Sequence, residues 1–132
     1  MPIRKLIDIT KGWLGFHVPV QAPPGVRAEF KLYYEDLLVG TLSVADGTWK
    51  FEYSDEFRHQ DDLRPLPEFP ELSEPYESKE LWQFFVMRIP SPEQAEVEEI
   101  LKREHIQEDD AVSLLRRFGE RTIANPFRLR AA

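Results

Sequence analysis

The three histidines, at positions 17, 59 and 105, are the side chains in this chain best suited to bind a metal or to carry a proton. They are far apart, and none has a partner at the spacing that metal ligands require. The chain has no cysteine, which excludes disulfides, thiolate metal sites and a cysteine nucleophile. We therefore expect no metal site and interpret each histidine as a surface or half-buried residue.

Other catalytic patterns are also missing from the sequence. The glycines at 12, 15, 40 and 47 form neither a phosphate-binding loop nor a dinucleotide fingerprint, and no serine lies in a nucleophile-elbow context. Carboxylates are plentiful, but in an acidic loop they are better interpreted as solvated charges than as an acid–base pair. The sequence thus predicts a protein that is not an enzyme and needs no cofactor.

Aromatic residues provide the strongest functional signal. Trp82, Phe84 and Phe85 follow one another closely, directly after a negatively charged loop. Two interpretations are open: these rings belong to the core, or they form part of a binding surface, where tryptophan is enriched. We predict that Trp82 and Phe85 contact a protein partner.

Charge is distributed unevenly along the chain. The net charge of −7 argues against general nucleic-acid binding, which needs a basic face. Residues 52–80 hold ten acidic residues against two arginines and one lysine, whereas residues 111–132 hold five arginines and one glutamate. The basic end is interpreted as a solvated face, as a surface for an acidic protein, or as a patch that packs on the chain's own acidic loop. Arg116, Arg117 and Arg121 are predicted to border the partner surface.

A nucleic-acid role remains as a weaker alternative. Residues 92–118 could form a helix-turn-helix that places Arg116, Arg117 and Arg121 on phosphates. The acidic helix that precedes them disfavours it.

Residues 1–27 are predicted to be an appendage followed by a proline-stiffened connector. Thr10, Gly12 and Gly15 limit any helix there to short lengths. We expect Trp13, Phe16 and Val18 to pack on the main body or on a partner, and a second copy of the chain is one such partner. No apolar run is long enough to cross a bilayer and no signal peptide is evident, so a cytoplasmic location is expected.

Residues 28–132 are predicted to form one α+β domain. The runs AEFKLYY, LVGTLSV and TWKFEY are typical of strands, and Asp46-Gly47 is a strong hairpin signal. They predict an antiparallel meander of three or more strands, with one apolar face that comprises Phe30, Leu32, Leu38, Leu42, Trp49 and Phe51. A proline-rich segment, 54–77, follows, and its regularly placed apolar residues predict that it is ordered.

Three short helices are expected after this segment. The first covers 79–89, is capped by Ser78 and is apolar all round, so it should be buried. The second starts at Ser91-Pro92 and the third covers about 108–118. The tail should lie extended and fray at its end.

In this order, the elements resemble the N-terminal subdomain of HipA-type serine/threonine kinases. The likeness is carried by YYEDLLVGTLSVADGTWKFEY, by LRPLPEFPEL, by ELWQFFVMRIP and by DDAVSLLRRFGER, over roughly residues 28–120. RRFGERTIANPF lacks the glycine-rich continuation found at that point in the kinases, and no kinase motif is present. The resemblance implies a free-standing, non-catalytic copy of this subdomain.

The same resemblance implies a function. In three-component toxin–antitoxin systems that resemble HipA–HipB, a small protein of this kind is made separately from a shortened kinase and neutralises it. We therefore expect an antitoxin-like or regulatory partner of a HipA-type kinase. The alternative is an independent, self-associating interaction or scaffold protein with no kinase partner.

Overall fold

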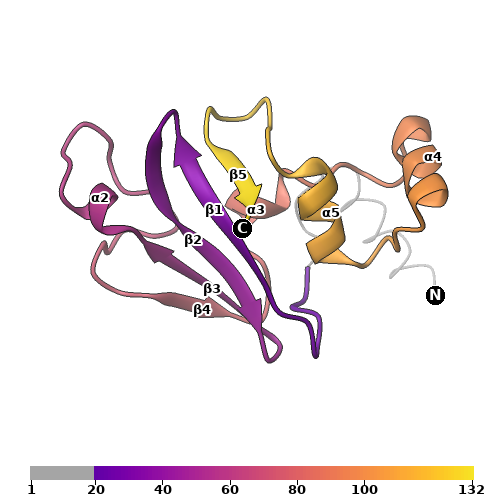
Figure 1. Cartoon of the computed structure of the whole chain (residues 1–132), viewed down its shortest axis with the longest axis horizontal. Coiled ribbons are helices and arrows are strands. Elements are labelled where there is room, and N and C mark those ends of the chain that lie inside the picture. The colour runs from indigo at the N-terminus through magenta and orange to yellow at the C-terminus, as the bar shows by residue number, and fades with distance from the viewer. Residues whose placement is uncertain (1–19) are drawn as a thin grey trace, which may run out of the picture.

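The computed structural model describes residues 20–132, which fold as an antiparallel sheet with short helices (Figure 1). This confirms the α+β class. Within the described residues the sheet has five strands in the order β4-β3-β2-β1-β5. The strands are β1 (Ala28–Tyr34), β2 (Leu37–Ala45), β3 (Thr48–Tyr53), β4 (Tyr76–Ser78) and β5 (Arg128–Ala131); the helices are α2 (Asp55–Arg58), α3 (Gln83–Val86), α4 (Ala95–Glu104) and α5 (Ala111–Phe118).

The predicted meander is formed by β1, β2 and β3. Asp46 and Gly47 have φ of 53° and 72°, and they join Ala45 directly to its strand partner Thr48. Glu35, at φ 52°, makes the first turn. Aspartate and glycine tolerate this left-handed conformation at low cost, which explains why the sequence signal was reliable.

A β-bulge in β2 makes the residues that face the core differ from those predicted. β1 pairs Leu32 with Gly40 but Tyr33 with Leu38, so Val39 is the extra residue. The bulge shifts the alternation of side chains by one position. As a result Val39 is fully buried, whereas Leu38, which was expected in the core, is only half-buried.

The proline-rich segment is ordered, as predicted. The Tyr53 hydroxyl donates to the Phe69 carbonyl at 2.7 Å and accepts from the Leu66 amide at 2.8 Å. Phe57 of α2 stacks on the Tyr53 ring with centroids 4.9 Å apart. Because Phe57, Leu66 and Phe69 are all buried, this long connection forms one wall of the core.

The first predicted helix is largely wrong. Ser78 ends strand β4 instead of capping a helix, and α3 covers only four residues after Trp82. The cause is a non-local pairing: the Leu81 amide bonds the Val20 carbonyl and the Ala22 amide bonds the Lys79 carbonyl, both at 2.8 Å. Glu80 therefore forms an isolated bridge with Gln21, and the helix does not begin until Gln83.

The other ends of elements also differ from expectation. A turn at Ser91–Gln94 delays α4 to Ala95, while Asp110 caps α5 by accepting from the Ser113 amide at 3.1 Å. The tail forms β5 on β1 instead of fraying. A second, small core lies between α4 and α5, with Val97, Leu101 and Leu114 at its centre. Over residues 20–132, no helix is both long enough and apolar enough to span a membrane.

Candidate functional site

Exposed apolar side chains concentrate around α3 and the turn at residues 122–125. Met87, which follows α3, is 41% exposed, and Ile123 at the turn is fully exposed. The two regions are adjacent, because the Asn125 amide nitrogen lies 3.8 Å from the Met87 sulfur. We call the partly or fully exposed apolar residues here the α3 surface; it consists of Trp82, Phe84, Met87, Ile123 and Phe127.

Trp82 is half-buried at the start of α3. Its ring meets that of Phe69 edge-on at 5.0 Å, so one side is anchored on the core. The neighbouring Phe84 is also half-buried, and its backbone amide bonds the Glu68 carboxylate at 2.7 Å. Trp82 is thus placed where it can contribute both to the core and to the surface.

Phe85 does not belong to this surface. It is wholly buried and lies 5.7 Å from Phe51 and 6.2 Å from Phe69, measured between ring centroids. A ring at this position cannot reach a partner while the core is intact. The interpretation of Phe85 as a partner-binding residue is therefore corrected to a core residue.

Arg88 holds the 122–127 segment against α3, and the sequence analysis did not identify this role. Its guanidinium donates to the carbonyls of Gly119, Glu120 and Phe127 and to the Asn125 side-chain oxygen, at 2.8–3.2 Å. The residue is buried, and desolvation lowers its pKa to about 10. At neutral pH the group is still charged, so its donors remain directed at the four acceptors. One signal was visible: an arginine within an apolar stretch.

The predicted arginines lie on the exposed side of the molecule. Arg117 makes two hydrogen bonds to the Glu104 carboxylate, at 2.9 and 3.0 Å, and Arg121 lies 3.9 Å from Glu120. Arg116 is exposed and has no carboxylate within 4 Å among residues 20–132. None of these contacts involves the acidic segment 52–80, so the described ion pairs do not support the interpretation that the basic patch packs on that segment.

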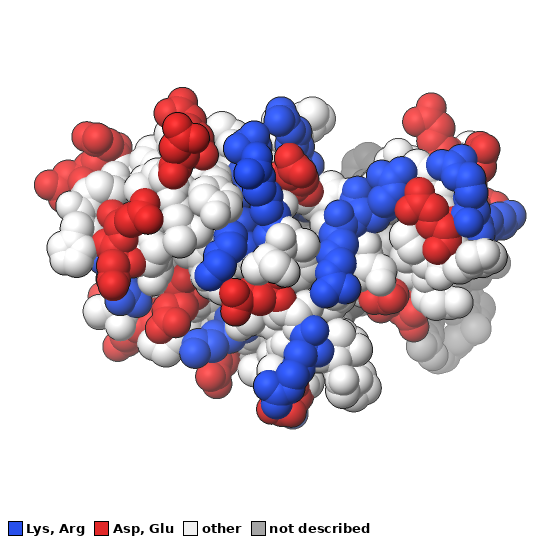
Figure 2. All heavy atoms as spheres, in the orientation of Figure 1, with Lys and Arg blue, Asp and Glu red and all other residues white. Residues whose placement is uncertain are grey.

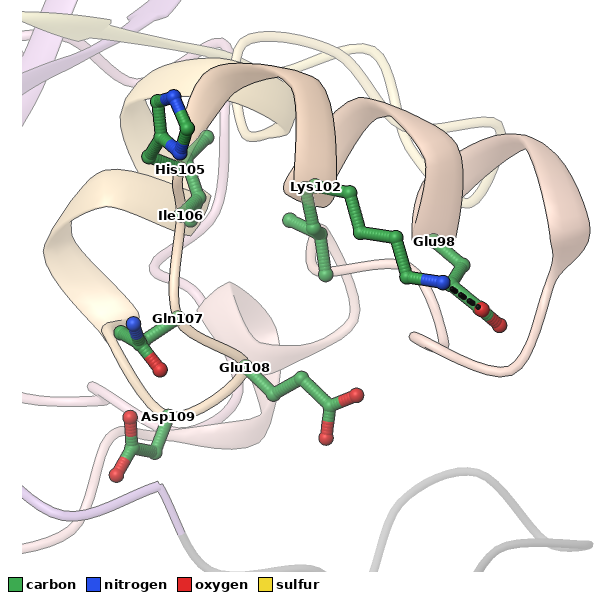
Figure 3. Close-up of a pocket in the computed structure, with 8 residues that line it drawn as sticks. Glu98, Lys102, His105, Ile106, Gln107, Glu108 and Asp109 are labelled. Carbon is green, nitrogen blue, oxygen red and sulfur yellow. Dashed lines mark ion pairs between the residues drawn. The ribbon is translucent and has the colours of Figure 1, made fainter.

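An open hollow of about 810 Å³ lies at the end of α4 and the connection to α5 (Figure 3). Its lining includes Lys102 and Glu98, which pair at 3.0 Å, and His105, Glu108 and Asp109, which come from the connection. In the part of the chain that the structure describes, no three histidine or acidic side chains converge to hold a metal ion. Among these residues the hollow therefore offers no metal site.

The predicted self-association residues Trp13, Phe16 and Val18 lie outside the described residues. Their role stays a prediction.

Comparison with known proteins identifies the fold. The family model of the HipA N-terminal domain matches residues 30–124, which include the meander, the proline-rich segment, α3, α4 and α5. No curated protein matches the chain significantly. The match begins within β1, close to the predicted domain start at residue 28, and it includes all of the α3 surface except Phe127.

Proposed function

Because the chain belongs to the HipA N-terminal domain family, we propose that it is a non-catalytic module that binds a HipA-type kinase as a separate chain and restrains it. In this proposal the protein acts in the cytoplasm as an antitoxin-like regulator and uses no cofactor. In this proposal the protein acts by binding through a surface, and we assign that role to the α3 surface.

The observation that carries the proposal is the exposure of Met87 together with that of Ile123, whose turn contacts Met87 through Asn125. Large apolar residues that are exposed together mark interaction sites more often than chance would place them. Arg88 fixes the turn that carries Ile123, so the surface is formed before a partner arrives. A preformed surface loses less conformational freedom on binding, which favours affinity.

The family membership supplies the kind of partner. A domain that packs on the rest of its own chain does so through a surface resembling a protein–protein interface. A separate copy of that domain retains such a surface and can present it to a kinase in trans. Trp82, half-buried at the edge of the α3 surface, has the side-chain type most enriched at interface hot spots.

The experiment is affinity capture of the tagged chain from its own cells, followed by mass spectrometry. We would run the wild type beside Trp82→Ala and beside the double substitution Met87→Asp and Ile123→Asp. The matched control is Val26→Asp, because Val26 is the other exposed large apolar residue among residues 20–132 and lies outside the α3 surface.

Capture of a HipA-type kinase by the wild type and by the Val26 variant, but not by the α3 surface variants, is the expected result. Equal capture by all forms would move the interface away from α3. Absence of a kinase in every sample would contradict the proposal and favour the self-associating scaffold.

A further inference from the structure

The sheet has an outer face, opposite its core, on which arginine side chains gather near β5. Leu129 is buried on the core side, so the alternation of β5 directs Arg128 and Arg130 to the outer face. The strand register sets Arg128 beside Tyr33 of β1 and Arg130 beside Lys31. In Figure 1 this face looks toward the viewer, with α3 behind the sheet.

Two further arginines extend this group. The Leu129 amide bonds the Glu120 carbonyl at 3.0 Å, which brings the residues after α5 alongside β5. Arg121 follows Glu120, and Arg116 lies one turn earlier on the exposed side of α5. Figure 2 shows basic side chains over β5 and α5, with a few acidic side chains among them. We call Arg116, Arg121, Arg128 and Arg130 the arginine face.

The positive charge of the arginine face is poorly neutralised within the described chain. Among residues 20–132, no carboxylate lies within 4 Å of Arg116, Arg128 or Arg130, and the one near Arg121 is at 3.9 Å. The Arg130 guanidinium lies instead over the Tyr33 ring, at 5.8 Å. This is unusual for a chain with 24 acidic residues against 17 basic ones, because carboxylates are available in excess. Glu29 of β1 pairs with Lys31 at 3.3 Å and Glu120 approaches only Arg121, so the charges of Arg116, Arg128 and Arg130 stay without an ion pair among residues 20–132 and a local positive potential remains.

We propose that the arginine face docks an acidic, extended segment of a partner protein that lies along β5. Guanidinium groups bind carboxylates with a pair of parallel hydrogen bonds, which a single lysine charge cannot do. Arg128 and Arg130 are two positions apart on a strand, and their spacing of about 6.4–6.8 Å equals that of alternate side chains on an extended peptide. Carboxylates at every second position of such a segment would meet both arginines.

Recognition through side chains fits the edge of β5 better than addition of a further strand. The outward amide of Leu129 is already bonded to the Glu120 carbonyl. The alternative occupant, nucleic acid, is disfavoured by the net charge of −7, which repels a phosphate backbone at longer range. In addition, the Arg130 guanidinium lies over the Tyr33 ring, 5.8 Å from its centroid, and so occupies one face on which a base could stack.

This inference does not rest on the kinase partner. The arginine face lies on the outer side of the sheet, whereas α3 lies on the core side. A failure of either proposal would leave the other intact.

The test uses the full chain and a fluorescein-labelled peptide of alternating glutamate and threonine, with binding followed by fluorescence anisotropy at low and physiological ionic strength. The variant carries Arg128→Glu and Arg130→Glu, and a milder variant carries Arg128→Gln and Arg130→Gln in case the first fails to fold. The matched control carries Arg64→Glu and Lys79→Glu, which make the same change in net charge on exposed residues of the acidic half. Three further probes are compared in the same way: a peptide of alternating lysine and threonine, a single-stranded oligonucleotide and a duplex oligonucleotide.

We expect the glutamate peptide to bind the wild type and the charge-matched control within about twofold of each other. The Arg128 and Arg130 reversal should weaken binding by about tenfold or more, because an attraction becomes a repulsion at both positions. The glutamine variant should lie between, and added salt should reduce the difference.

Three outcomes would overturn the proposal. One is absence of glutamate-peptide binding at low ionic strength, or binding that the reversal leaves unchanged. Another is tighter binding of an oligonucleotide through the same arginines, which would assign the face to nucleic acid. The third is concentration-dependent self-association in sedimentation that the reversal removes, which would make the occupant a second copy of this chain.

Discussion

Gly40 shows how one residue type can be required by close packing alone. A Cβ atom at this position would lie 2.5 Å from the Glu52 carbonyl oxygen and 2.7 Å from the Phe51 ring. Gly40 follows the bulge residue Val39, where β2 and β3 approach closely. Any side chain would therefore push β3 or the Phe51 ring out of place.

We predict that Gly40→Ala lowers the free energy of unfolding by about 1–3 kcal/mol, the usual cost of overpacking. The measurement is urea unfolding followed by circular dichroism. Gly47→Asn is the control, since nothing lies within 4 Å of a Cβ there and asparagine tolerates the φ of 72°. An unfolding midpoint for Gly40→Ala equal to that of the wild type would contradict the assigned close approach.

Arg88 is the second residue whose role is set by its contacts. Its substitution by methionine keeps the apolar stem and removes one donor from each of four acceptors. Two of these keep a second donor, because the Glu120 carbonyl also accepts from the Leu129 amide and the Asn125 side-chain oxygen from the Phe127 amide. We predict a loss of about 2–3 kcal/mol in stability, together with faster amide hydrogen exchange in residues 119–127. Arg116→Met, on the exposed side of α5, should change neither quantity. If the exchange rates in Arg88→Met match those of the wild type, Arg88 does not hold this segment.

Among the helices and strands, a prediction was correct where its sequence signal lay within a few residues and wrong where the element depends on a distant partner. The Asp46-Gly47 turn and the alternation of Trp49, Phe51 and Tyr53 predicted the meander correctly, because both signals lie within a few residues. The helix expected over 79–89 was mostly wrong, because its first residues pair with residues 20–22, about sixty positions away. Local helical periodicity cannot anticipate such a partner.

The same limit applied to the tail and to the candidate site. β5 follows a proline and has only four residues, so nothing local indicated that β1 would accept it as a neighbour. Trp82 was identified from its type, and the structure leaves it half-buried at the edge of the α3 surface. The exposure of Ile123 was not predicted. It depends on the position of the surrounding segment, which Arg88 holds through acceptors 31–39 positions further along the chain.

Tyr53 joins two elements, and its hydroxyl gives a prediction that depends on pH. Burial raises its pKa from the ordinary value of 10 to about 12. Below pH 10 the phenol is protonated in both the folded and the unfolded chain. Between pH 10 and 12 the unfolded chain releases the proton first, so this group makes stability fall as pH rises.

We predict that Tyr53→Phe loses about 1–3 kcal/mol at pH 7, because the Leu66 amide and the Phe69 carbonyl lose their partner. The stability advantage of the wild type over this variant should shrink as pH increases above 10. Urea unfolding at a series of pH values measures both effects. Tyr34→Phe serves as the control, since the Tyr34 hydroxyl has no hydrogen bond within residues 20–132. A constant difference between wild type and Tyr53→Phe across this range would contradict the raised pKa.

At the scale of the whole molecule, two surfaces lie on opposite sides of one small sheet. The α3 surface is apolar and lies on the core side, while the arginine face is basic and lies on the outer side. Net charge alone would have hidden the second surface, because the chain is acidic overall. We therefore propose that affinity for the kinase comes from burial of the α3 surface and that the arginine face makes a separate, salt-sensitive contact.

The central claim is that the chain binds a HipA-type kinase and restrains it through the α3 surface. It is tested most directly by titrating the purified kinase from the same cells with the chain while its phosphorylation activity is followed. We predict inhibition that saturates at one chain per kinase. Ile123→Asp should need about tenfold more protein or worse, and Val26→Asp should match the wild type. Kinase activity that is unchanged at saturating concentrations of the chain, or inhibited equally by Ile123→Asp, would contradict the account.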